Sequence, residues 1–224
     1  MPISSSDQRL ARITGVLFLI TYATSIPALL LFENTVLDDP RYIVGAGDDG
    51  QVRLGAFLEV ILIMANIGTA LALYPVLKRR SEALSLGFVT ARVMESVFIA
   101  VGILSLLALV TLRQEGGDAG SLVPVGEALV AIKDWTFLLG PGLTVGVGNG
   151  LILGYLMYRT GLVPRGMAML GLIGGPLIIL SGLGVLFDLY DLGEGPQLIA
   201  TIPEFFWELS LGIYLTVKGF KSPS

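Results

Sequence analysis

The fold is decided by stretches such as residues 54–77, which read LGAFLEVILIMANIGTALALYPVL. This stretch carries a single charged side chain, Glu59. A helix needs about 20 mostly apolar residues to cross a hydrocarbon core of about 30 Å. Residues 54–77 meet that requirement, so they predict a transmembrane helix.

Five more stretches meet the same requirement. They are residues 13–32, 86–112, 137–158, 166–187 and 198–217. The composition agrees, because 54% of the chain is hydrophobic and only 14% is charged, whereas soluble domains carry roughly 25% charged residues. We therefore expect an all-α, polytopic bundle of about six transmembrane helices. No linker divides the chain, so residues 1–224 should form one domain.

The basic residues predict how the bundle is oriented. Lys and Arg in short loops gather on the cytoplasmic side of a membrane. With the N-terminus inside, four basic residues fall outside or near the outer boundary, and nine fall on the cytoplasmic side. We therefore expect a multi-pass protein of the plasma membrane with both termini in the cytoplasm. The nine residues are Arg9, Arg12, Lys78, Arg79, Arg80, Arg159, Arg165, Lys218 and Lys221.

The chain contains no Cys and no His. This absence excludes disulfides, His- or Cys-ligated zinc, His-ligated haem, Cys nucleophiles and Ser-His-Asp triads. We expect no cofactor and no metal ion, although the composition leaves a carboxylate-only metal site open.

The segment before the fourth apolar stretch is unusual. Residues 124–139 have helical character and end at Gly140-Pro141-Gly142. Proline lacks an N–H and its ring clashes with the preceding turn of a helix. The pattern predicts a broken or extended fourth segment, with a helix on the outer side and an interruption at Pro141. The alternative is a helix that simply begins with Pro141 near its first turn.

Several ionisable side chains lie inside the predicted spans. A charged side chain at the centre of a membrane helix costs at least about 2.5–3.5 kcal/mol, so it usually faces the bundle interior and marks a functional candidate. Arg92 and Glu95 are three residues apart, and Glu204 and Glu208 are four apart, so each pair shares one helix face. The candidate ligand-binding residues are Glu59, Asn66, Arg92, Glu95, Lys133, Asp134, Trp135, Asn149, Glu204, Trp207 and Glu208.

These candidates predict a polar pocket inside the membrane. Glu59 and Glu204 lie at similar depth below the outer ends of their helices, and Lys133 with Asp134 reaches the same level. We expect these four to converge on one cavity open to the outer face. The candidate carboxylates outnumber the cations, which favours a cationic or amphipathic small-molecule ligand. Arg92 should pair with an acidic residue, and the nearest candidates are Glu95 and Glu208.

Other functions fit the same residues. An intramembrane enzyme could use Glu95 and Glu208 as acid and base. A structural or regulatory partner of another membrane protein could use the charges only to fix helix register. The Gly-rich stretches around Gly146 and Gly175 favour close helix packing, within the bundle or in a homo-oligomer. We expect the lipid bilayer and a small-molecule or lipid ligand as partners, and no nucleic acid.

Four runs of the sequence resemble a known family. They are residues 11–19 (ARITGVLFL), residues 65–68 with 72–77 (ANIG and ALYPVL), residues 134–142 (DWTFLLGPG) and residues 207–212 (WELSLG). These runs are similar to the bacterial DUF4386 family of membrane proteins, and the resemblance covers nearly the whole chain. It implies a six-helix membrane protein. It implies no activity, because the function of the family is unassigned, and it carries no residue roles.

Overall fold

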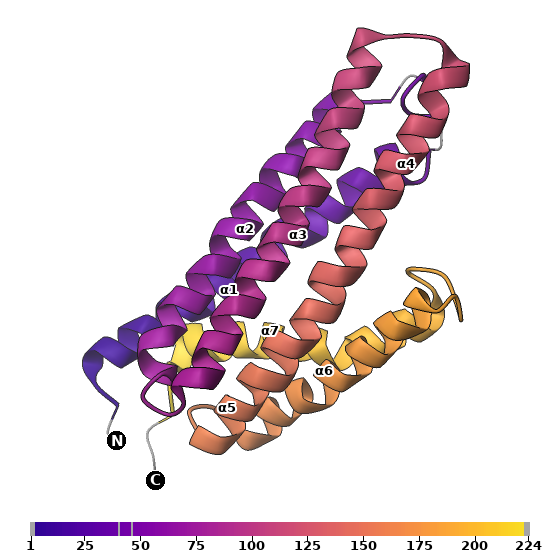
Figure 1. The fold of residues 1–224 in the computed structure, drawn as a ribbon. Helices are drawn as coiled ribbons and strands as arrows, with labels where there is room; N and C mark the ends of the chain where they lie inside the picture. Colours follow the sequence, from indigo (N-terminus) through magenta and orange to yellow (C-terminus); the bar gives the residue numbers. More distant parts are fainter. Residues whose placement is uncertain (1–2, 40, 46, 222–224) are drawn as a thin grey trace.

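The computed structural model describes residues 3–39, 41–45 and 47–221, and these residues form a bundle of helices (Figure 1). Six of its helical segments are long and apolar enough to cross a membrane, which confirms the predicted all-α, six-span architecture. Their elements are α1 (Ser5–Phe32) with η1 (Glu33–Leu37), α2 (Asp49–Leu77), α3 (Glu82–Glu115), α4 (Ala119–Phe137) with η2 (Leu138–Thr144), η3 (Gly146–Leu153) and α5 (Gly154–Thr160), α6 (Arg165–Leu186) and α7 (Gly195–Lys218).

The helices α1 to α4 begin before the predicted apolar stretches because polar caps set their starts. Ser4 and Asp7 form a capping box at α1, in which each side chain accepts a hydrogen bond from the other residue's backbone N–H. Asp48, Ser81 and Asp118 cap α2, α3 and α4 by accepting hydrogen bonds from backbone N–H groups of the first turn. Such caps satisfy donors that an α-helix leaves free at its start.

The fourth segment is extended, but the expected interruption at Pro141 is wrong. The chain stays helical from Ala119 to Thr160, and the α-helical pattern changes to a π-helical one in η2 and η3. The amide of Val145 donates to the carbonyl of Gly140, five residues earlier. A π-type turn accommodates a residue that cannot donate, so Pro141 widens the helix instead of ending it.

The two termini lie at the same end of the bundle, as an even number of spans requires (Figure 1). We call this the terminus end; it also holds the turns at 78–81 and 161–164. The opposite side of the bundle, called the far end, holds residues 41–45 and the connections 116–118 and 187–194. α1 packs mainly against α2 and α7, α3 lies between α2 and α4, and α6 packs against α7 and η3.

Glycines bring α6 and η3 into close backbone contact. A Cβ on Gly146 would lie 2.9 Å from the carbonyl oxygen of Gly175, and a Cβ on Gly150 would lie 2.8 Å from the Gly175 nitrogen. These distances leave no room for a larger residue. The Gly-rich faces named above therefore pack against each other inside the chain, and any homo-oligomer would need another surface.

Candidate functional site

The ionisable residues inside the membrane-spanning segments lie between two apolar clusters. One cluster includes Phe18, Phe88 and Leu211 toward the terminus end, and the other includes Phe32 and Leu109 toward the far end. Between them the side chains form two groups. The Lys133–Glu59 pair is one group. The other, called the central polar cluster, consists of Asn66, Thr69, Arg92, Glu95, Asn149, Glu204 and Glu208.

Arg92 of α3 organises the central polar cluster. Its Nη1 donates to Oε2 of Glu95 at 2.7 Å, and its Nε lies 3.3 Å from Oγ1 of Thr69. Its guanidinium carbon also lies 5.4 Å from the ring centroid of Phe18. Glu95 accepts a second hydrogen bond, from Nδ2 of Asn66 at 2.9 Å. The expected pairing of Arg92 with an acidic residue is thus confirmed, and Glu95 is the nearer partner.

Glu208 brings α7 into the same cluster. Its Oε1 lies 3.9 Å from Nη1 of Arg92 and accepts a hydrogen bond from the amide of Asn149. Asn149 lies in the π-helical element η3, and its backbone carbonyl accepts from the buried indole N–H of Trp207 at 3.0 Å. The amide of Gly154 donates to the same carbonyl. Two residues of α7, Trp207 and Glu208, therefore both bind Asn149 in the widened helix.

Glu204 differs from the other carboxylates of the cluster. It is only 2% exposed, and neither of its carboxylate oxygens has a hydrogen-bond partner among the described residues. Glycines of two helices surround it: a Cβ on Gly174 would lie 2.8 Å from its Oε2, and a Cβ on Gly150 2.9 Å. Nη2 of Arg92 and Oδ1 of Asn149 are also buried without a partner in the part of the chain described. The cluster therefore has unused hydrogen-bonding capacity around Glu204 and Glu208.

In the Lys133–Glu59 pair, by contrast, both carboxylate oxygens have a hydrogen-bond donor. Nζ of Lys133 lies 2.6 and 2.8 Å from the two carboxylate oxygens of Glu59. It also lies 4.8 Å from the ring centroid of Phe32, and a Cβ on Gly102 would lie 3.3 Å from it. The charges of the pair cancel in a closed, apolar setting, which is how a buried ion pair is tolerated.

The geometry can now be compared with known proteins. A model of the family described as "Domain of unknown function (DUF4386)" matches residues 13–219. The chain belongs to the DUF4386 family. The resemblance inferred from its sequence is confirmed, and with six membrane-spanning segments this DUF4386 protein is an integral membrane protein. Comparison with curated proteins and with solved structures finds no match.

The expectation that Glu59, Lys133, Asp134 and Glu204 converge on one cavity is wrong. Glu59 pairs with Lys133 of α4, whereas the carboxylate of Glu204 lies against Gly174 of α6 and Gly150 of η3. The two glutamates therefore lie in separate surroundings. The cause is the packing of α7, which contacts α1, α6 and η3 and so turns Glu204 away from α4.

The remaining candidates divide between the interior and the surface. Trp207 is fully buried and supports Asn149, whereas Trp135 is 46% exposed and Asp134 is half-buried. Successive helix positions are about 100° apart, so a buried Lys133 turns Trp135 to the outside of the bundle. Trp135 therefore cannot be a wall of an interior pocket in this DUF4386 protein. Glu95 is held by Arg92 and Asn66, which leaves it poorly placed for acid–base work.

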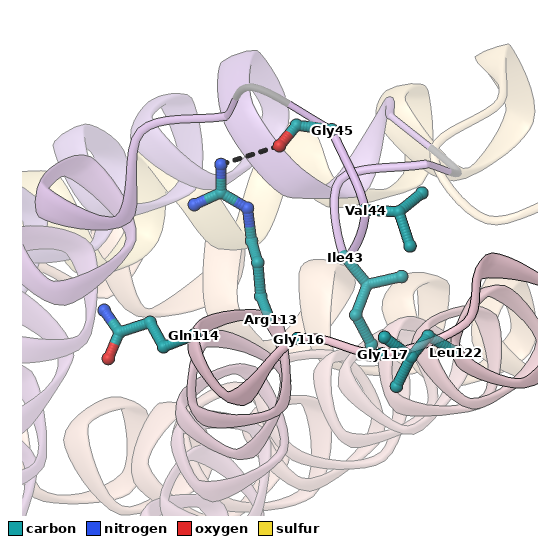
Figure 2. Close-up of a pocket in the computed structure, with 8 residues that line it drawn as sticks. All are labelled: Ile43, Val44, Gly45, Arg113, Gln114, Gly116, Gly117 and Leu122. Carbon is teal, nitrogen blue, oxygen red and sulfur yellow. Dashed lines mark hydrogen bonds between the residues drawn. The ribbon is translucent and has the colours of Figure 1, made fainter.

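A surface pocket of about 270 Å³ lies at the far end, and none of the candidate residues lines it. Figure 2 shows Arg113 at its edge, donating to the carbonyl of Gly45 at 2.8 Å. Arg113 also pairs with Asp49, which accepts from the Tyr42 phenol at 2.7 Å. Burial and this hydrogen bond raise the pKa of Tyr42, so the phenol stays a donor at physiological pH. The pocket lies where residues 43–45 contact the end of α3.

Sequence reasoning missed two members of the site. Thr69 lies three residues after Asn66, and that spacing could have indicated its place on the same face of α2. Phe18 carries no such signal, because it is one apolar residue among many in α1. Its contact with Arg92 follows only from how α1 packs against α2 and α7, which brings Phe18 to the central polar cluster.

Proposed function

We propose that this membrane protein binds and transports a small cation at the carboxylates of Glu204 and Glu208. The observation that carries the proposal is the burial of Glu204, which is 2% exposed, without a hydrogen-bond partner in the part of the chain that the structure describes. A carboxylate anion in such a place is unstable unless something compensates its charge. A proton compensates it in the resting protein, and an incoming cation takes the place of that proton.

The charge balance of the cluster supports a cationic ligand. Arg92 lies 2.7 Å from Glu95 and 3.9 Å from Glu208, so its single charge is already shared before Glu204 is counted. Three carboxylates around one guanidinium leave an excess of negative charge if all are ionised. One cation, together with the free Oδ1 of Asn149, would complete the site.

The packing around Glu204 favours a small ligand over an amphipathic one. Gly150 and Gly174 press against the carboxylate so closely that neither can carry a Cβ without displacing it. The enclosing helices α6, α7 and η3 therefore leave space for an ion or a small amine rather than a long apolar tail. We further propose that the protein lies in the plasma membrane with the terminus end in the cytoplasm. The nine basic residues at that end support this orientation.

A carbodiimide test addresses the proposal, because dicyclohexylcarbodiimide modifies protonated carboxyl groups in apolar surroundings. We expect an adduct at Glu204 in purified protein at neutral pH, detected by mass spectrometry and absent from Glu204→Gln. Sodium, potassium and methylammonium are the probes for binding, and at least one of them should slow the reaction. Glu59→Gln is the matched control and should leave the adduct at Glu204. No adduct at Glu204, or a rate that none of the three cations changes, would contradict the proposal.

A further inference from the structure

Basic side chains at the terminus end are paired with tyrosines at the rim of the bundle. The Arg159 guanidinium carbon lies 5.8 Å from the ring centroid of Tyr155, and its Nη1 lies 3.2 Å from the Tyr155 hydroxyl. The Arg165 guanidinium carbon lies 5.5 Å from the centroid of Tyr158. Such contacts orient an arginine without cancelling its charge.

These two arginines and Lys221 lie around one turn at this end of the bundle. Arg159 ends α5 and Arg165 begins α6, on either side of the turn 161–164, where Gly161 adopts φ 65°. The backbone N–H of Lys221 donates to the carbonyl of Leu162 in that turn at 2.7 Å. We call Arg159, Arg165 and Lys221 the basic corner. Figure 1 shows α5 and the start of α6 at the end of the bundle that holds both termini.

The basic corner lacks acidic partners. All three side chains are exposed, and within the described residues no carboxylate forms an ion pair with any of them. By contrast, Arg79 at the same end pairs with Asp7 at 2.5 Å. The corner therefore presents uncompensated positive charge directly beside apolar spans.

The depth and chemistry of the basic corner fit a lipid headgroup. The apolar residues Leu151 and Met169 are exposed on the same helices, one to three turns toward the membrane from Arg159 and Arg165. Tyrosines and basic residues at the ends of spans occupy the headgroup level. We propose that the basic corner binds the phosphate of an anionic phospholipid in the leaflet on this side. The phosphate is held by Arg159, Arg165 and Lys221, and the Tyr155 and Tyr158 rings contact the glycerol region. This inference does not depend on the cation site.

Native mass spectrometry of the purified protein in detergent tests the proposal, with phosphatidylglycerol and phosphatidylcholine as probes. The wild type should retain phosphatidylglycerol in preference to phosphatidylcholine. Each basic residue near a membrane surface contributes about a fivefold factor in affinity for anionic lipid, so Arg159→Gln/Arg165→Gln should bind about 25-fold more weakly. Lys221→Gln, a single change beside the same turn, should show the smaller loss of about fivefold.

The matched control is Arg41→Gln/Arg53→Gln, which removes the same charge from exposed positions at the far end. It should keep the wild-type affinity. An equal loss in this control, or equal retention of the two lipids, would overturn the proposal. A competition experiment with inorganic phosphate completes the test. If phosphate at millimolar concentration displaces the lipid, the basic corner binds free phosphate and the lipid assignment is wrong.

Discussion

Arg92, Lys133 and Glu204 show three ways in which a membrane bundle holds an ionisable residue. Lys133 meets both oxygens of one glutamate, and Arg92 is shared between two. Glu204 forms neither an ion pair nor a hydrogen bond with any of the described residues. Insertion of each group is costly, and only the first two have a visible compensation. This contrast separates a structural pair from a candidate site.

The Lys133–Glu59 pair should be structural, and Lys133→Met tests this. Removal of one partner leaves the other buried and unpaired, which should lower the free energy of unfolding by about 3 kcal/mol. The double variant Lys133→Met/Glu59→Leu should recover most of the loss, because apolar side chains of similar size replace a buried pair at little cost. Reversible unfolding in mixed micelles measures both. A double variant as unstable as the single one would show that the pair does more than cancel charge.

At the same scale, sequence spacing predicted the pairing of Arg92 with Glu95, because both lie on one helix. It could not predict that Lys133 pairs with Glu59 and leaves Glu204 alone. That choice depends on how α7 is rotated and tilted against α2 and α4, and no pattern within a single helix encodes such a relation. Phe18 was missed for the same reason, whereas the spacing of Thr69 from Asn66 could have indicated its place.

The fourth segment shows what an element's sequence can and cannot predict. Gly140-Pro141-Gly142 correctly indicated that a regular α-helix does not continue there. The expected break failed because a freed carbonyl inside a membrane must find another donor. Backbone hydrogen bonds that span five residues supply such donors. The Thr144 hydroxyl adds another by donating to the carbonyl of Leu139, five residues earlier, at 2.6 Å. The chain therefore remains helical, and the widened stretch carries Asn149 into the central polar cluster.

The contact between α6 and η3 should depend on its glycines. In Gly175→Ala the new Cβ would lie 2.7 Å from the carbonyl oxygen of Gly146. This oxygen belongs to the backbone, so the clash can be relieved only by moving one of the two helices. We expect the free energy of unfolding to fall by about 1–3 kcal/mol, the usual cost of overpacking. Gly166→Ala on the same helix meets no atom within 4 Å and is the control. Equal stability of the two variants would show that the close approach of α6 and η3 is absent in solution.

The whole molecule has a strong charge asymmetry that predicts its topology. Nine basic residues lie at the terminus end, whereas Asp188, Asp191 and Glu194 occupy one far-end loop. The chain has no cysteine, so a single introduced one reports its side of the membrane. In cells, Gly195→Cys should react with a membrane-impermeant maleimide, and Gly166→Cys should react only after the membrane is opened. The reverse pattern would place the termini outside and contradict the predicted orientation.

The proposed cation site depends on the protonation state of Glu204, which infrared spectroscopy of the protein in lipid vesicles measures directly. The difference between wild type and Glu204→Gln at neutral pH should contain the C=O stretching band of a protonated carboxyl group. That band should weaken when the cation that slows the carbodiimide reaction is added, because the cation replaces the proton. A difference spectrum with only carboxylate bands, or a protonated band that no cation diminishes, would contradict a cation site at Glu204.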